Sequence, residues 1–201
     1  MDALNALPEA VYPNDPQPEF VSIDSRGRQA VVSLQENNAL AIVDLAKATV
    51  TDIVPLGYKD HGLAANALDV ADSDGKNPVI QIATAPNVLG MYQPDAMASY
   101  TVGGKTYLVT ANEGDAREYD GFAEEVRIRA HCDKGLDPTV FANADQLILD
   151  SNLGRLRVTA APNGNLTGKN AAGQCTELYT FGARSFTVWD AASVMPVFSG
   201  L

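Results

Sequence analysis

The chain has 201 residues, of which 46% are hydrophobic, and its 25 acidic and 14 basic residues give a formal net charge of -11. This length is typical of one domain or slightly more, and the apolar content excludes a disordered chain. The acidic charge argues against nucleic acid as a partner, because binding to phosphates needs a basic surface. It is typical of a protein in an extracellular medium or of one that binds cations, although solubility alone also explains it.

The ends and the longest apolar runs give two further expectations. Met1 to Ala10 carry neither the basic start nor the apolar block of a signal peptide, so we expect none in this chain. No apolar run approaches the roughly 20 residues of a membrane span, so we also expect no transmembrane segment. Residues 1–17 are interpreted as an N-terminal segment that precedes the first strand.

Residues 18–57 contain the pattern of one four-stranded antiparallel sheet. A first strand begins at Pro18, the chain turns at Gly27, and a second apolar strand follows from Ala30. Apolar residues then alternate between two faces in NNALAIVD, and a last strand closes at Gly57. Four antiparallel strands in about 40 residues is the size of one β-propeller blade.

A second copy of this pattern starts at Pro94 and is interrupted. PDAMASYTVGGKTYLVTANEGDA resembles PEFVSIDSRGRQAVVSLQENNA, with a base after the glycine turn in both copies, at Arg28 and Lys105. Its second half lies far downstream, where ARSFTVWD aligns with NNALAIVD. We therefore expect an all-β, propeller-like fold with an incomplete ring over residues 18–201: a blade at 18–57, a connecting segment at 58–93, an interrupted blade at 94–111 and 183–200, and an insertion at 112–182.

The insertion has enough apolar residues to pack, and residues 142–149 are expected to form a short helix. Cys132 and Cys175 lie near its two ends, and with only two histidines a zinc site is not expected. They form either a disulfide or two buried thiols. We favour the disulfide, because closing this loop removes about 4 kcal/mol of entropy from the unfolded chain in the simple model. A disulfide in turn favours an oxidising compartment.

Several segments resemble a known family. YQPDAMASY, KTYLVTANEGDAREYDGFAEEVRI and ELYTFGARSFTVWDA are similar to segments of the choice-of-anchor I family, and the resemblance extends from about Tyr12 to Gly200. These are secreted or surface-attached bacterial β-propeller proteins, some of them labelled alkaline-phosphatase-like. The resemblance implies an extracytoplasmic location, whether periplasmic, secreted or at the cell surface. It also implies that this chain is a fragment, because two blades do not close the family's ring.

The segment TANEGDAREYDGF places several charged and amide side chains directly after an apolar strand. Asn112, Glu113 and Asp115 offer oxygen ligands of the kind that Ca²⁺ or Mg²⁺ prefers. Arg117 is a candidate ligand for a phosphate or carboxylate, and Arg184 in the returning segment is a second one. The structural alternative is that Glu113 and Arg117 pair with each other, or with backbone, to anchor the insertion.

A second candidate calcium site lies at LDVADSDGKNP. Asp69, Asp72 and Asp74, followed by Gly75, resemble the start of a calcium loop. The distal Glu of such loops is absent, and Asp-Gly is also an ordinary hairpin turn. The family often has an Asp- and Gly-rich run before ELY, but the corresponding residues here contain no Asp.

These observations favour an extracytoplasmic binding or scaffold module for an unidentified protein or cell-surface partner, with Ca²⁺ as a candidate cofactor. The alternative is a metal-dependent phosphoesterase, in which the acidic cluster would hold cations that activate water. The sequence provides no identifiable nucleophile and no pair of histidines for that chemistry. Whether the protein is an enzyme is left open, with the non-enzymatic interpretation preferred. Trp189, on an alternating strand, is expected in the core.

Overall fold

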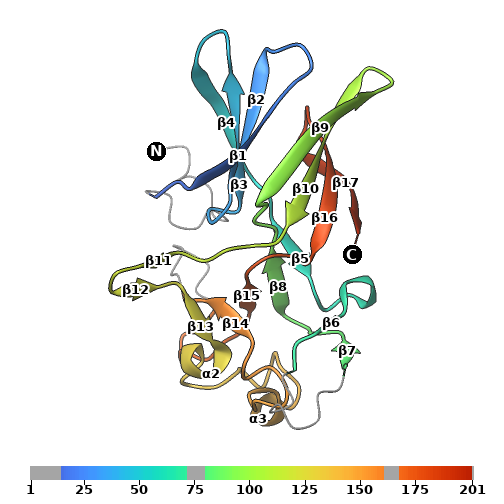
Figure 1. The fold of residues 1–201 in the computed structure, drawn as a ribbon. Helices are drawn as coiled ribbons and strands as arrows, with labels where there is room; N and C mark the ends of the chain where they lie inside the picture. Colours follow the sequence, from blue (N-terminus) through green and yellow to red (C-terminus); the bar gives the residue numbers. More distant parts are fainter. Residues whose placement is uncertain (1–14, 72–79, 161–167, 201) are drawn as a thin grey trace. The chain divides into compact units, whose positions relative to one another are not determined.

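The computed structural model describes residues 15–71, 80–160 and 168–200 (Figure 1). These residues form mostly antiparallel β-sheets with a few short helices, which confirms the all-β class. They make up separate open sheets and do not close a ring. The chain divides into two compact units, which are described one at a time: unit 1 comprises the described residues of Met1–Gly57, Met91–Asp115 and Gly182–Leu201, and unit 2 those of Tyr58–Gly90 and Ala116–Phe181.

The first sheet of unit 1 is a meander of four consecutive strands. Its order is β1-β2-β3-β4, and every pair is antiparallel. β-branched and aliphatic residues alternate along the strands, which suits the two faces of a pleated sheet. The strands are β1 (Pro18–Ile23), β2 (Gln29–Leu34), β3 (Ala39–Asp44) and β4 (Thr49–Pro55).

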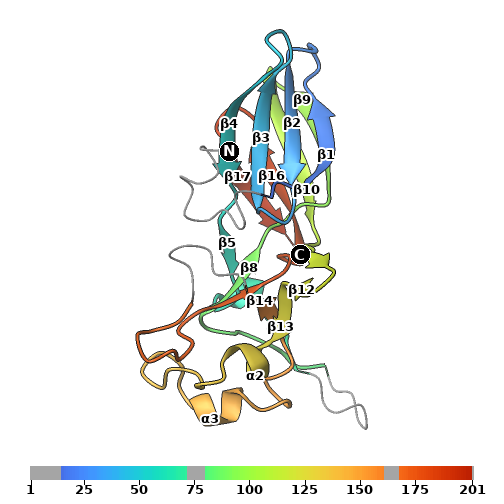
Figure 2. The same cartoon turned by 90° about the vertical axis from the view of Figure 1, so that its left-hand side faces the viewer.

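The second sheet of unit 1 combines two distant parts of the chain. Its order is β17-β16-β10-β9, so β10 pairs with β16 across the long segment that separates them (Figure 2). Thr110 lies opposite Thr187, and Tyr107 lies opposite Asp190. The strands are β9 (Ala96–Val102), β10 (Lys105–Asn112), β16 (Ser185–Asp190) and β17 (Met195–Gly200).

The two sheets repeat each other in irregular details as well as in strand order. Asn38 and Arg184, at aligned positions just before β3 and β16, both have a left-handed backbone, with φ of 53° and 45°. The Asp44 and Asp190 side chains each accept hydrogen bonds from backbone N–H groups of the turn that follows. The β3–β4 ladder also shifts register after Ile42, as the β16–β17 ladder does at the aligned position. Because bulges and left-handed residues are specific features, both sheets are built on one pattern.

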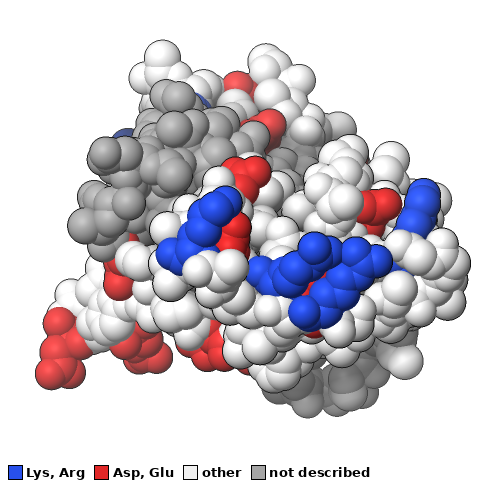
Figure 3. Space-filling view, turned by 90° about the horizontal axis from the view of Figure 1, so that it is seen from above, with Lys and Arg blue, Asp and Glu red and all other residues white. Residues whose placement is uncertain are grey.

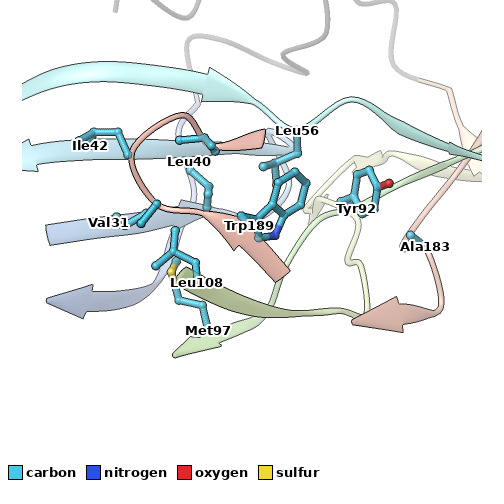
Figure 4. Packing of buried hydrophobic residues seen from close by; sticks show 11 residues of the cluster. Val31, Leu40, Ile42, Leu56, Tyr92, Met97, Leu108, Ala183 and Trp189 are labelled. Atoms are coloured by element: carbon cyan, nitrogen blue, oxygen red, sulfur yellow. The ribbon is translucent and has the colours of Figure 1, made fainter. Parts of the chain in front are cut away.

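The core of unit 1 lies between these two sheets (Figure 4). Trp189 is 1% exposed, and its ring meets Tyr92 edge to face with centroids 5.3 Å apart. The expectation that Trp189 belongs to the core is therefore confirmed. β1 and β9 are the strands at which the two sheets lie closest, and Ser99 Oγ donates there to the carbonyl of Ile23. The other labelled core residues are Val31, Leu40, Ile42, Leu56, Met97, Leu108 and Ala183.

Unit 2 is built from two separate parts of the chain. β15 (Leu178–Thr180) pairs in parallel with β8 (Val88–Met91), which also neighbours β5 (Tyr58–Asp60). The sequence indicated that the insertion would pack, but it did not indicate that the insertion shares a sheet with the connecting segment. The remaining elements are η1 (Ala64–Asn66), β6 (Leu68–Asp69), β7 (Ile82–Ala83), β11 (Glu118–Tyr119), β12 (Phe122–Ala123), β13 (Glu125–Arg127), α2 (Ile128–His131), α3 (Ala144–Leu147) and β14 (Arg157–Thr159).

The expected disulfide is confirmed. Cys132 and Cys175 are joined with an S–S distance of 2.08 Å and a sequence separation of 43. Both are buried within the apolar cluster of unit 2, which also contains Ile128, Phe141 and Leu178. The expected helix at 142–149 is present as the single turn α3. None of the helices in the described part of the chain has the length and apolar character that crossing a membrane requires.

Candidate functional site

Two buried residues, Asn38 and Gln93, make hydrogen bonds close to every position at which the chain leaves or enters unit 1. The Asn38 side chain accepts from the backbone N–H of Gln93 over 3.1 Å and donates to the carbonyl of Gly57 over 2.8 Å. The Gln93 side chain donates to the carbonyl of Asp115 over 3.0 Å and accepts from the N–H of Gly182 over 3.2 Å. The bonded residues Gly57, Gln93, Asp115 and Gly182 all belong to unit 1 and flank the two segments that form unit 2.

Asn112, a predicted metal ligand, lies inside unit 1 and is 1% exposed. Its side-chain oxygen accepts from the Thr110 hydroxyl over 2.8 Å, and its amide group donates to Ser185 and Thr187. Trp189 Nε1 donates to Thr110 Oγ1, which extends this network across β10 and β16. The Asn112 side chain thus joins the two distant halves of the second sheet.

Glu113 and Asp115 follow Asn112 and are exposed. The backbone beside them is tightly packed, because a Cβ on Gly182 would lie 1.8 Å from the carbonyl oxygen of Glu113. Gly182 also has a positive φ of 70°, which favours glycine. The start and the end of the insertion therefore touch here, and the two carboxylates project from this point of contact.

Arg117, predicted to bind an anion or to pair with Glu113 or with backbone, lies in unit 2 and pairs with Glu124. Its Nη1 is 3.5 Å from Glu124 Oε2, and both side chains are almost completely buried. Glu124 also accepts from the backbone N–H of Arg117 and from the Thr159 hydroxyl. Arg184, the other predicted anion ligand, is exposed in unit 1.

The second predicted calcium loop is described only in part. The Asp69 carboxylate accepts from the N–H groups of Ala71 and Gln81, so it holds together the β6–β7 hairpin. Asp72 and Asp74 lie outside the described residues. Within 15–71, 80–160 and 168–200, no three side chains of His, Cys, Asp or Glu are grouped so that they could hold a metal ion. Calcium binding at either position stays a prediction.

The sheet β15-β8-β5 of unit 2 contains two titratable groups in altered environments. Burial lowers the pKa of Lys59 from its ordinary value. Burial also raises the pKa of Tyr179, as does the hydrogen bond that its hydroxyl donates to Glu177. Tyr179 packs against Tyr58 with ring centroids 5.1 Å apart. The raised pKa keeps the Tyr179 hydroxyl protonated near neutral pH, and burial disfavours the charged form of Lys59.

Two cavities were not predicted from the sequence, because the residues that line each of them come from segments far apart in the chain. Unit 2 has a mostly apolar cavity of about 410 Å³ whose walls include Phe141, Leu147 and Leu153. Unit 1 has a polar cavity of about 400 Å³ among its hairpin turns. The sequence held one signal for the second cavity, namely the bases Arg28 and Lys105 after the glycine turns of both repeats.

A comparison with protein-family models matches residues 8–200 to the choice-of-anchor I domain. The chain belongs to this family. The family match confirms the resemblance seen in the sequence. Searches of the curated proteins and of the solved structures found no match.

Proposed function

We propose that this choice-of-anchor I protein is an extracytoplasmic β-propeller module that binds or scaffolds a protein or cell-surface partner. The observation that carries the proposal is the repetition of one sheet pattern in unit 1, with a second unit inserted between its strands. Propellers repeat four-stranded antiparallel sheets about a central channel, and their loops often bear the binding residues.

The faces of the two sheets support a repeating arrangement. Val31 and Ile42 lie opposite each other on the face of the first sheet that packs on the second. In the second sheet, Val188 aligns with Ile42 and lies opposite Val109, and this pair is on the face directed away from that core. If this packing repeats, the outer face of the second sheet packs on a third sheet, just as the first sheet packs on the second.

That outer face is apolar, as such packing requires. Phe186 and Phe198 pack there with tilted rings whose centroids are 5.5 Å apart, and they are 42% and 54% exposed. Tyr100 and Tyr107 continue the face onto β9 and β10, with centroids 5.4 Å apart. A contiguous aromatic surface on a sheet marks a packing or interaction site. We propose that a further blade of the same protein covers it.

The disulfide supports an extracytoplasmic location. Cys132–Cys175 closes most of the longer segment of unit 2 and lies in its core. Structural disulfides persist in secreted, periplasmic and cell-surface proteins and are rare in reducing compartments. The family name is consistent with attachment at a cell surface, and we assign the recognition role to unit 2 because it is inserted into the repeating scaffold.

The outer-face proposal is tested by substitution in the protein as its host produces it. Phe198→Lys is expected to destabilise the protein by more than about 2 kcal/mol, because a charge would be buried beneath the next blade. Leu63→Lys, at a position in unit 2 that is 55% exposed, is the matched control and should have little effect. Equal small effects of both variants in denaturant unfolding would contradict the proposed blade packing.

The location and the non-enzymatic role are tested separately. In fractionated host cells, the protein should lie outside the cytoplasm with both cysteines resistant to alkylation until reduction. Cytoplasmic protein with reactive thiols would overturn the assignment. The same preparation should not hydrolyse a generic phosphate ester with added Ca²⁺ or Mg²⁺; metal-dependent hydrolysis would replace the scaffold role with that of a phosphoesterase.

A further inference from the structure

We propose that the hairpin-turn end of unit 1 is a binding site for an oxyanion on a small polar ligand. The site, called here the turn pocket, is the cavity of about 400 Å³ bounded by the β1–β2, β9–β10 and β16–β17 turns. Its cationic residues are Arg26, Arg28 and Lys105. The proposal concerns unit 1 alone, and it depends neither on propeller closure nor on the partner of unit 2.

The positive charge is concentrated in an otherwise acidic protein. Three of the 14 basic residues of the chain line this one cavity, although the formal net charge is -11. They come from two turns that are far apart in sequence. Figure 3, which views the molecule from the end where these turns lie in Figure 1, shows Lys and Arg side chains gathered there with acidic ones between them.

The two carboxylates that line the pocket are engaged by their own turns. Asp24 Oδ1 accepts from the N–H groups of Arg28 and Gln29, at 2.7 and 3.1 Å. The hydrogen bonds from Gln29 and then Arg28 are the main causes that lower the pKa of Asp24. Asp190 Oδ1 accepts from the N–H groups that follow it, at Ala192 and Ser193. Both acids thereby fix the turns that present the cations.

The cations are less constrained than the two carboxylates, although the charge of Arg28 also acts on Asp24. Arg26, Arg28 and Lys105 form no ion pair in the part of the chain that the structure describes, whereas Lys47 at a neighbouring turn pairs with Asp44 over 3.0 Å. All three are exposed, so their charges remain hydrated until a ligand enters. A site with three cations and two engaged carboxylates has a net attraction for anions.

The dimensions and lining indicate the class of ligand. The cavity lies within the range of about 300–1,000 Å³ that is typical of small-molecule sites and exceeds what a free phosphate needs. Arg binds phosphate, sulfate or carboxylate oxygens in bidentate fashion, and Lys adds a point charge. Thr101 and Thr106, whose hydroxyls lie 3.2 Å apart, add hydrogen-bonding groups. This lining suits an acidic sugar, with its oxyanion on the cations and its hydroxyls on the threonines.

Calorimetric titration at low salt tests the proposal with four probes: inorganic phosphate, glucose 6-phosphate, glucuronic acid and neutral glucose. At least one acidic sugar is expected to bind saturably, and more tightly than glucose. Comparison of the phosphorylated and carboxylated sugars identifies the oxyanion, while comparison with inorganic phosphate shows whether the sugar contributes. Arg28→Gln and Arg26→Gln should each weaken that binding about tenfold, the loss expected for one charged hydrogen bond.

Lys47→Gln is the matched control, because it removes one positive charge from the same end outside the pocket. Both arginine variants keep the backbone N–H groups that Asp24 binds, and unchanged Trp189 fluorescence will show that the core of unit 1 is intact. No saturable binding of any anionic probe would overturn the proposal. So would equal losses in the Arg28→Gln and Lys47→Gln proteins, since that result indicates general ionic attraction.

Discussion

Gln93 and Asn38 are hydrogen-bonded to each other in the interior of unit 1, and both have a left-handed backbone. The Gln93 N–H donates to Asn38 Oδ1 over 3.1 Å, both residues are fully buried, and their φ angles are 40° and 53°. Through their side chains they also bind the backbone of Gly57, Asp115 and Gly182. Two residues thus fix every connection by which the chain passes out of unit 1 and back.

Removal of the Gln93 side chain should therefore be costly. Gln93→Ala leaves the carbonyl of Asp115 and the N–H of Gly182 without their amide partner, and we expect a loss of about 2–4 kcal/mol in the free energy of unfolding. Gln146→Ala, at an exposed position in α3, should change stability by less than about 0.5 kcal/mol. Urea unfolding of both variants provides the comparison; similar values would show that the bonds to Gln93 are dispensable.

Gly182→Ala should be among the most damaging single substitutions. The new Cβ would lie 1.8 Å from the Glu113 carbonyl oxygen, so the insertion's two ends would have to separate. We expect a loss above about 4 kcal/mol. Gly27→Ala is the control for backbone strain. Gly27 has a similar φ of 64°, but no atom lies within 4 Å of its Cβ position, so this variant has the strain without the clash. It should cost only about 1 kcal/mol, and equal losses would mean that φ alone limits both positions.

The buried pair of Arg117 and Glu124 predicts a contrast with a surface pair. Arg117→Met leaves the Glu124 carboxylate buried without its cation, and we expect a loss of about 3–5 kcal/mol. Arg129→Met breaks the exposed pair with Asp150 and should cost less than about 1 kcal/mol. Thermal unfolding will distinguish the two, and full tolerance of Arg117→Met would show that Arg117 does not stabilise unit 2.

Reduction of the disulfide should weaken unit 2. The loop-entropy model assigns about 4 kcal/mol to a cross-link with this sequence separation. The Cys132→Ser, Cys175→Ser double variant should show lost amide-exchange protection in β13 to β15. Trp189 is the only tryptophan and lies in the core of unit 1, so its fluorescence reports unit 1 alone. Protection in β13 to β15 that matches the parent protein would contradict a stabilising role.

Calcium dependence is tested at the exposed acids that follow Asn112. Calorimetric titration of Ca²⁺ into chelator-treated protein should give micromolar-range binding that a Glu113→Ala, Asp115→Ala variant abolishes, because carboxylate oxygens are the ligands that Ca²⁺ requires. Glu118→Ala, Asp120→Ala removes two other exposed acids and should leave binding unchanged. Absence of heat in the parent protein, or equal heat in both variants, would mean that these acids only flank the insertion.

The strands of unit 1 were predictable because alternating apolar residues, glycine turns and a repeated Asp mark them in the sequence. The pairing of β10 with β16 was expected from the alignment of ARSFTVWD with NNALAIVD. The parallel pairing of β15 with β8 had no such signal, because both strands are short and lack a repeated motif. The disulfide was favoured over two buried thiols because the cysteines lie near the two ends of the insertion.

The site was less predictable than the fold. The residue type of Asn112 suits a metal, but its neighbours Thr110, Ser185 and Thr187 occupy its polar atoms, and only the folded sheet brings these residues together. Pairing of Arg117 with Glu113 was one of the alternatives, but the β11–β12 hairpin returns the chain so that Glu124 reaches Arg117. The role of Gln93 had no sequence signal, since it depends on segments that meet only in three dimensions.

The hydrogen bonds of Asn38 and Gln93 have a consequence for how such a protein can vary. In the first sheet, β2 and β3 are joined by a short turn at the place where β10 and β16 are separated by the insertion. Because the residues that flank both segments of unit 2 are bonded through Asn38 and Gln93, we expect the scaffold of unit 1 to be independent of the length of unit 2. Under the proposed function, a change in the length or sequence of unit 2 would then alter recognition while the sheets of unit 1 keep their register.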